Sequence, residues 1–287
     1  MAQSPAHTWG QAIGNVIERG VEPLLQSVAN EYSLYLDQKG PRAARKGKKV
    51  TWTDKYGNTH DLDFVLERRG TDHSRGDPAG FIEVAWRRYT KHSRNKAQEI
   101  QGAVLPLAET YAVHRPFLGA VISGEFTEGA LEQLSSLGFH ILYFDYESVL
   151  AAFESVGIDA RTEESTPVPE LREKIDAWQG LTEDEKDSVS ENLFDICSDK
   201  VAEFIVAMRL SFGRAIQQIR ILPLFGSSID FLLIDEAQHF LMDSSKFNIP
   251  GSLARIEVEV IYSNGDSLTG KFNDPDAASS FLETIAR

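Results

Sequence analysis

The chain has 287 residues, enough for one large domain or two smaller ones, and its net charge is −14 at pH 7. Apolar residues make up 42% of it, as in ordinary folded proteins. No stretch reaches the roughly 18 to 20 apolar residues that span a bilayer. The first residues have no basic patch followed by an apolar run, so we expect no secretory signal. The single cysteine, Cys197, excludes an intrachain disulfide and argues against a cysteine-based zinc site. We expect a cytoplasmic protein without membrane association.

The first half of the chain predicts a mixed α/β core. Apolar residues recur every 3.6 positions over residues 9–37, which predicts a helix, and a basic loop follows. Glycine, proline and alternating apolar residues then predict the remaining elements. These are a hairpin over 50–70, a strand over 80–86, a helix beginning at Ser93 and kinked or interrupted at Pro106, a strand over 116–124, a helix over 127–138, a strand over 139–146 and a helix over 147–157.

The second half changes character. Residues 159–203 are acidic and helix-prone, which predicts a solvated helical arm or linker. A further helix and two short strands follow, and the chain ends with a second unit formed by a hairpin and a helix. These elements are a helix over 201–219, short strands over 220–226 and 228–234, a hairpin over 254–272 turning at Asn264-Gly265, and a final helix that Asp274 caps and Pro275 begins.

Positive charge is concentrated in one segment of this acidic chain. Residues 39–96 hold 15 Lys and Arg against 7 Asp and Glu, whereas the rest of the chain holds 14 against 36. Such asymmetry is expected where one face of a protein meets a polyanion. The plainer interpretation is a solvated loop followed by a charged helix.

Two acids in this segment suggest metal chemistry. Asp63 and Glu83 lie in neighbouring predicted strands and are flanked by apolar residues, so burying them is unfavourable unless they meet a cation. Hydrolysis of a phosphodiester at neutral pH uses a divalent cation, and Mg²⁺ takes one or two protein carboxylates while keeping its waters. We therefore expect a Mg²⁺ or Mn²⁺ site.

The arrangement of these residues resembles a known family. Asp63, 19 intervening residues and then Glu83-Val84-Ala85 stand between a leading helix and an amphipathic helix. This order resembles the PD-(D/E)XK nuclease superfamily, and the likeness covers roughly residues 10–157, with GAVISG and ILYFDY completing the sheet. The resemblance implies a restriction-endonuclease-like fold, an α/β architecture with a mixed central sheet flanked by helices.

The resemblance also implies roles for individual residues. Asp63 would be the first metal-binding acid, Glu83 the second, and the carbonyl of Val84 a third ligand. Two acids on the strand of Asp63 are rivals for its role, and an acid of the first helix sometimes completes such a site. The rivals are Asp61 and Glu67, and the helix acids are Glu18, Glu22 and Glu31.

Ala85 departs from the family pattern, which usually has a lysine at this position to hold the attacking water and stabilise negative charge. Either a cation from farther along the chain replaces that lysine, or the site has lost catalysis and only binds DNA. The candidate replacements are Lys91, Lys96 and Arg87.

The cations after Glu83 also form a predicted DNA-binding segment, because they straddle a strand end and a helix N-terminus, where backbone N–H groups favour anions. Its members are Arg87, Arg88, Lys91, His92, Arg94 and Lys96. Farther along the helix, Gln98, Glu99 and Gln101 either support the metal or lie on an exposed face.

Two other motifs are set aside. The DEAQ stretch within residues 232–239 is similar to an ATPase box, but GDSLTGKF at 265–272 follows it and has Phe272 where Mg²⁺ needs Ser or Thr. His60 lies beside Asp61 and Asp63, yet strand alternation places it on the opposite face.

These observations predict a Mg²⁺-dependent DNA endonuclease serving restriction or defence. We expect a nuclease domain over residues 1–158, an acidic helical arm over 159–218 and a C-terminal α+β unit over 219–287 for dimerisation or specificity. The expected partners are DNA, a second copy of the chain, and a methyltransferase or other defence protein. The alternatives are a catalytically inactive DNA-binding or assembly subunit with the same fold, and an acidic interaction protein whose resemblance is accidental.

Overall fold

A computed structural model describes residues 4–90, 93–223, 227–243 and 255–286. The chain forms two compact units. Unit 1 comprises residues 1–111 and 116–209, and unit 2 comprises residues 112–115 and 210–287. No helix within the described ranges combines the length and apolar character that crossing a membrane requires.

Unit 1 is built on a mixed five-stranded sheet with the order β1-β4-β5-β6-β7. Its strands are β1 (Leu34–Gln38), β4 (Phe64–Arg68), β5 (Asp77–Arg87), β6 (Phe117–Gly124) and β7 (His140–Asp145). The pairs β1–β4 and β4–β5 are antiparallel, whereas β5–β6 and β6–β7 are parallel. A separate antiparallel pair, β2 (Val50–Thr53) and β3 (Thr59–Leu62), stands beside this sheet.

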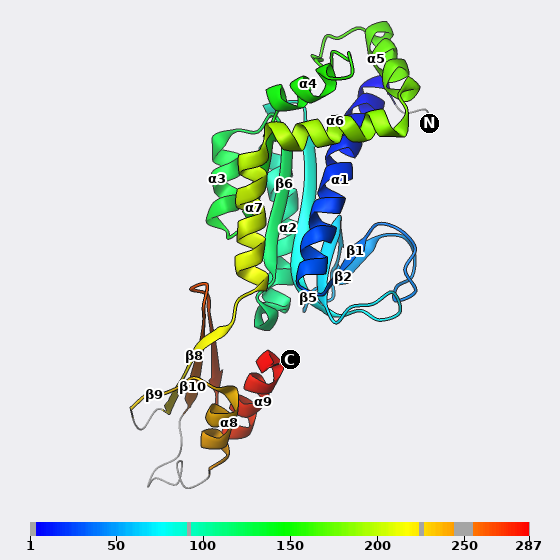
Figure 1. Cartoon of the computed structure of the whole chain (residues 1–287). Helices are drawn as coiled ribbons and strands as arrows, with labels where there is room; N and C mark the ends of the chain where they lie inside the picture. The colour runs from blue at the N-terminus through cyan, green and yellow to red at the C-terminus, as the bar shows by residue number, and fades with distance from the viewer. Residues whose placement is uncertain (1–3, 91–92, 224–226, 244–254, 287) are drawn as a thin grey trace. The chain divides into compact units, whose positions relative to one another are not determined.

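Helices cover both faces of the sheet (Figure 1). The helices of unit 1 are α1 (Pro5–Glu31), α2 (Ser93–Thr110), α3 (Glu128–Ser136), α4 (Tyr146–Glu154), α5 (Val168–Gly180), α6 (Glu183–Ile196) and α7 (Ser198–Phe212). On one face, Phe204 of α7 contacts Phe117 of β6 with ring centroids 5.5 Å apart. On the other face, the apolar side of α2 packs on Phe81 and Ala120 in a fully buried cluster.

The first helix ends earlier than its periodicity predicts. It stops at Glu31, and Ser33 adopts a positive φ of 53° before β1 begins at Leu34. The apolar positions of β1 suit a helical period and a strand alternation equally well. Pairing of β1 with β4 decides between the two, so the predicted helical segment beyond Glu31 was wrong. In contrast, α2 continues through Pro106, so of the predicted kink or interruption there the interruption is excluded.

The second arm of the predicted hairpin is two strands rather than one. The backbone bends at Asp63, so β3 pairs with β2 while β4 joins the central sheet. All four residues 64–67 are buried, as expected for a strand covered on both faces. The bend therefore places Asp63 where the small sheet meets the large one.

The acidic segment belongs to unit 1. Helices α5 and α6 bury Leu171, Trp178 and Leu193, and the Ser190 hydroxyl of α6 donates to the Val16 carbonyl of α1 at 2.8 Å. The sequence predicted a solvated arm here, because charges on the exposed faces dominate the composition. The buried positions instead attach these helices to the core that the first 158 residues form.

Unit 2 is a four-stranded antiparallel sheet with the order β11-β10-β8-β9. Its elements are the 3₁₀ turn η2 (Ala112–His114), β8 (Ile216–Pro223), β9 (Ile229–Phe231), α8 (Ile234–Met242), β10 (Ile256–Tyr262), β11 (Ser267–Phe272) and α9 (Pro275–Ala286). The predicted helix over 201–219 was too long, since α7 ends at Phe212 and Ile219 is buried within β8.

The motifs set aside in the sequence have structural roles in unit 2. The DEAQ stretch starts α8, whose Ala237 and Leu241 are buried in the unit's core. The GDSLTGKF stretch turns into β11, which pairs with β10, so it does not form a strand-to-helix phosphate loop. The Asp274 carboxylate accepts from the Ala277 N–H at 2.8 Å and caps α9 as predicted.

Candidate functional site

Asp63 and Glu83 come together through strand pairing. Phe64 of β4 pairs with Ile82 of β5, and Asp63 and Glu83 are the residues next to this pair. Residues next to an antiparallel pair lie close together across the two strands. The Asp63 carboxylate also accepts a hydrogen bond from the Val84 N–H at 2.7 Å. Two acids that are 20 positions apart in the sequence therefore share one site.

Burial disfavours the charge of both carboxyl groups. Glu83 is 7% exposed, and burial followed by the nearby Asp63 charge raises its pKa to about 8. Burial also raises the pKa of Asp63, although the Val84 N–H and the charge of Lys96 oppose that effect. The Oε1 atom of Glu83 is buried and has no hydrogen-bond partner within the described residues. The pair therefore presents an unsatisfied oxygen to its surroundings.

The positive charge of Lys96 acts on both acids. This lysine lies in the first turn of α2 with its side chain 18% exposed, and its charge lowers the pKa of Asp63 and of Glu83. Ala85 shares the strand face of Glu83 and is 3% exposed in the core beneath α2. Lysine is thus absent from the strand position, and the charge of Lys96 acts on both carboxyl groups from α2.

Helix α1 adds a third acid on the Asp63 side. Burial and then the charge of Asp63 raise the pKa of Glu18, while the charge of Lys39 lowers it. A pocket of about 390 Å³ opens here, lined by Asn15, Glu18, Arg19, Glu22, Gln38, Lys39, Asp63 and Phe64. Glu22 accepts a hydrogen bond from Gln38 at 2.7 Å, and Glu31 instead pairs with Arg209. Of the three helix acids considered, Glu18 is therefore the one coupled electrostatically to Asp63.

The acids suit a hard cation. Within the described ranges, no three His, Cys, Asp or Glu side chains are gathered closely enough to enclose a metal ion. Mg²⁺ nevertheless needs only one or two protein carboxylates, and it keeps several of its waters. The neighbouring carboxyl groups of Asp63 and Glu83, together with the unpartnered Glu83 oxygen, fit that requirement.

The two rivals of Asp63 are engaged elsewhere. Asp61 is exposed, and its carboxylate accepts from the Lys49 ammonium at 2.5 Å and the Thr51 hydroxyl at 2.6 Å. Glu67 is 0% exposed and accepts two hydrogen bonds from Arg42, at 2.6 and 2.8 Å. Both contacts are structural ion pairs, which leaves Asp63 as the acid that lies near Glu83.

The cations of the predicted DNA-binding segment differ in their contacts and exposure. Arg88 donates to the Thr162 carbonyl at 2.6 Å and to Glu125 at 2.9 Å, and it lies 4.0 Å from the Tyr146 ring centroid. Its guanidinium is thus held within unit 1. Arg87 contacts Glu99 at 3.4 Å, and Arg94 is exposed on α2. The predicted contacts of Lys91 and His92 lie outside the described residues.

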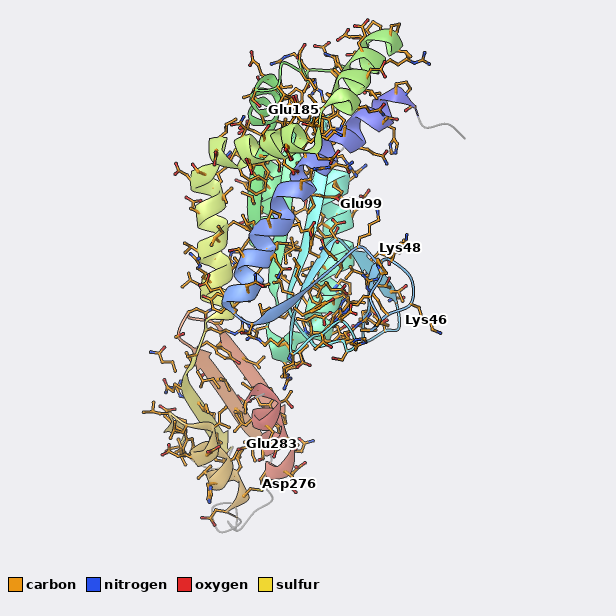
Figure 2. The ribbon with its side chains drawn as sticks, turned by 45° about the vertical axis from the view of Figure 1, so that its right-hand side comes forward. Lys46, Lys48, Glu99, Glu185, Asp276 and Glu283 are labelled. Carbon is orange, nitrogen blue, oxygen red and sulfur yellow. The ribbon has the colours of Figure 1, made fainter. Side chains whose placement is uncertain are left out.

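The polar residues of α2 also differ in role. Glu99 contacts the ammonium of Lys96 at 3.4 Å as well as Arg87, and Figure 2 shows it along α2. Gln101 accepts from Gln133 at 3.1 Å, so it links α2 to α3. Gln98 is exposed, as the plainer sequence interpretation predicted.

His60 does not join the acids. Its Nε2 atom lies 3.0 Å from Asp54 Oδ2, and this hydrogen bond is the first cause of the lowered pKa of Asp54. One residue of the site was not foreseen in the sequence: Lys39 lowers the pKa of both Asp63 and Glu18. Lys39 directly follows β1, whose apolar spacing also fits a helix, so its position depends on the pairing of β1 with β4.

Comparison with known proteins does not supply a function. No family model and no curated protein matches the chain. A crystal structure of AF1548, described as a protein of unknown function, is similar over 64% of this chain and 98% of its own, with 10% identity and a TM-score of 0.28. A functional assignment therefore stands on the residues of the chain itself.

Proposed function

We propose that unit 1 is a metal-dependent DNA endonuclease in which Asp63 and Glu83 hold the cation. The observation that carries this proposal is the buried pair of neighbouring carboxyl groups, on both of which the charge of Lys96 acts. Burying two acids together is unfavourable for folding, and such perturbed groups concentrate at functional sites. The resemblance to the PD-(D/E)XK superfamily supports the same assignment through the order of elements around Asp63 and Glu83.

The residues divide the chemistry between them. Bound Mg²⁺ or Mn²⁺ would supply the positive charge that lowers the pKa of an attacking water and offsets charge on the phosphate. Asp63 and Glu83 provide the oxygen ligands, and Glu83 must lose its proton to do so because its pKa is about 8. The positive charge of Lys96 acts on both carboxyl groups, and in the proposed reaction it would stabilise negative charge developing on a phosphate oxygen.

The remaining parts of the proposal concern assembly and biological role. The mixed sheet and its flanking helices would be a restriction-endonuclease-like domain, with unit 2 serving dimerisation or target selection. Cutting both strands of a duplex suits a two-fold dimer, because symmetry presents one site to each strand. The proposed role is restriction or defence against foreign DNA in the cytoplasm.

Cleavage of supercoiled plasmid in Mg²⁺ or Mn²⁺ tests the proposal. We expect the wild-type chain to nick the plasmid, and Asp63→Asn and Glu83→Gln to abolish nicking. The matched control is Asp61→Asn, because Asp61 lies two residues from Asp63 but is exposed and paired with Lys49. Absence of cleavage by the wild-type chain in either metal would overturn the proposal, and so would equal cleavage by all four proteins.

The same assay tests a second candidate function, that of a DNA-binding subunit without catalysis. The buried Ala85 favours it, because the strand carries no cation beside Glu83. Duplex binding by the wild-type chain, without cleavage in either metal, would establish this alternative.

A further inference from the structure

The segment between β1 and β2, residues 39–49, is rich in positive charge and is called the basic loop below. It contains four lysines and two arginines and has no acidic residue. Its backbone is closed by a hydrogen bond from Gly40 N–H to the Lys48 carbonyl at 2.8 Å. A second bond, from Ala44 N–H to the Asp72 carbonyl at 2.9 Å, ties it to the turn that precedes β5. The basic loop is therefore an ordered element of unit 1.

The two arginines of the basic loop point inward. Arg42 has a 2% exposed side chain that contacts Asp37 at 2.8 Å and Glu67 at 2.6 Å, and it also donates to backbone carbonyls. Arg45 donates to the Gln38 carbonyl at 2.6 Å and to the Gly40 carbonyl at 2.7 Å. Their donors are used within the protein, so these arginines set the shape of the loop.

The lysines point outward. Lys46 and Lys48 are exposed and form no ion pair in the described part of the chain. Figure 2 shows both on the loop that projects from the body of unit 1. Lys49 differs from them because it contacts Asp61 at 2.5 Å. The buried Arg42 and Arg45 side chains thus hold the loop on which Lys46 and Lys48 are exposed to solvent.

The basic loop begins at the candidate site. Lys39, its first residue, lines the same pocket as Asp63 and Glu18. Its positive charge acts on both of these acids. Positive charge therefore continues along the chain from the carboxyl pair to the exposed lysines.

We propose that the basic loop binds the phosphodiester backbone of duplex DNA next to the candidate site, with Lys46 and Lys48 as its phosphate contacts. The inference rests on the proposed function, since it names a surface that would serve that site. Phosphates carry the dense negative charge that exposed lysines on an ordered loop attract. Arg42 and Arg45 are positioning residues that hold this surface in shape. This surface adds to the cations after Glu83, among which Arg88 already has protein partners.

Binding is measured without cleavage, by fluorescence anisotropy of a labelled 20-base-pair DNA duplex with the full-length Asp63→Asn chain and no divalent cation. The Lys46→Ala/Lys48→Ala variant is compared with it over a range of NaCl concentrations. Each lost phosphate contact reduces the slope of log affinity against log salt by about 0.9, so the slope should become shallower by about 1.8. Between 50 and 200 mM salt, the parent should then lose affinity by a factor about twelve times larger than the variant does.

Two controls separate this surface from a general effect of charge. Lys46→Arg/Lys48→Arg keeps the charge and should keep the slope of the parent. Arg172→Ala/Lys200→Ala removes two exposed cations from α5 and α7 and should also leave the slope unchanged. Tryptophan emission confirms folding of each variant. An unchanged slope for Lys46→Ala/Lys48→Ala, an equal decrease for Arg172→Ala/Lys200→Ala, or no duplex binding by the parent overturns the inference.

The failure of this inference is distinguishable from failure of the proposed function. Plasmid cleavage by the wild-type chain, with a slope that ignores Lys46 and Lys48, would refute the binding surface alone. Duplex binding that depends on these lysines, without cleavage in either metal, would refute the nuclease and keep the surface.

Discussion

Glu83→Gln should change how the stability of unit 1 depends on pH. Lifting the pKa of Glu83 from 4.5 to about 8 means that the folded state binds more protons than the unfolded state between these values. Stability is therefore lost as pH rises through this window. Each pKa unit corresponds to about 1.4 kcal/mol, so wild-type Glu83 lowers the free energy of unfolding by roughly 4 kcal/mol between pH 5 and pH 8.5. Glutamine does not titrate and removes this contribution.

Urea unfolding at pH 5 and at pH 8.5 measures the difference. All four tryptophans of the chain, Trp9, Trp52, Trp86 and Trp178, belong to unit 1, so their emission follows the unfolding of that unit. The comparison uses the change in the free energy of unfolding between the two pH values, because a packing effect of the glutamine amide that is the same at both values then cancels. Equal changes in the wild-type chain and in Glu83→Gln would refute the argument that Glu83 is protonated by burial.

Adding Mg²⁺ to the same unfolding experiment gives an independent test of Glu83 as a metal ligand. Mg²⁺ binds ionised carboxylates, so it should stabilise the wild-type chain more at pH 8.5 than at pH 5. Glu83→Gln should show a smaller effect of Mg²⁺ at pH 8.5. Identical stabilisation of both proteins would exclude Glu83 as a ligand, whatever the result of a cleavage assay.

Three further substitutions test the neighbours of the site. Lys96→Ala should lower the single-turnover cleavage rate by about 10²- to 10³-fold, because it removes a positive charge that acts on both proposed metal ligands; a rate within threefold of wild type would exclude that role. Arg42→Met should lower the free energy of unfolding by about 3 to 5 kcal/mol in urea, since Asp37 and Glu67 would remain buried without their cation. A loss below 1 kcal/mol would show that water or rearrangement replaces Arg42. Ala85→Lys should cost about 2 kcal/mol or more without raising the cleavage rate, because Ala85 lies in the core beneath α2; a faster, equally stable variant would contradict this.

Local pattern was sufficient for much of the fold. The strands β5, β6 and β7 and the helices between them follow from compact apolar runs and helical periods, because those patterns record which face of each element is buried. The Asn264-Gly265 turn and the Asp274 cap were likewise predicted, since each depends on residues only a few positions apart. The same local reasoning singled out Glu83 as an acid inside an apolar strand.

Partner choice needed the tertiary structure. Tyr35 satisfies a helical period and a strand alternation, and only pairing of β1 with β4 decides that it is in a strand. The sequence left Asp61 and Glu67 as rivals of Asp63, and ion pairs with Lys49 and Arg42 resolved the competition.

The sequence by itself determined most of the helices and strands, and it showed acidic residues within apolar strands, where burial disfavours their charge. Both follow from neighbouring residues in the chain. Only the tertiary structure decided which charged side chains lie close together. The pairing of β4 with β5 places Asp63 near Glu83, and the charge of Lys96 acts on both from α2. The basic loop turns Arg42 inward and Lys46 outward. Contacts across 12 or more positions depend on how whole elements pack, and no local period encodes that packing.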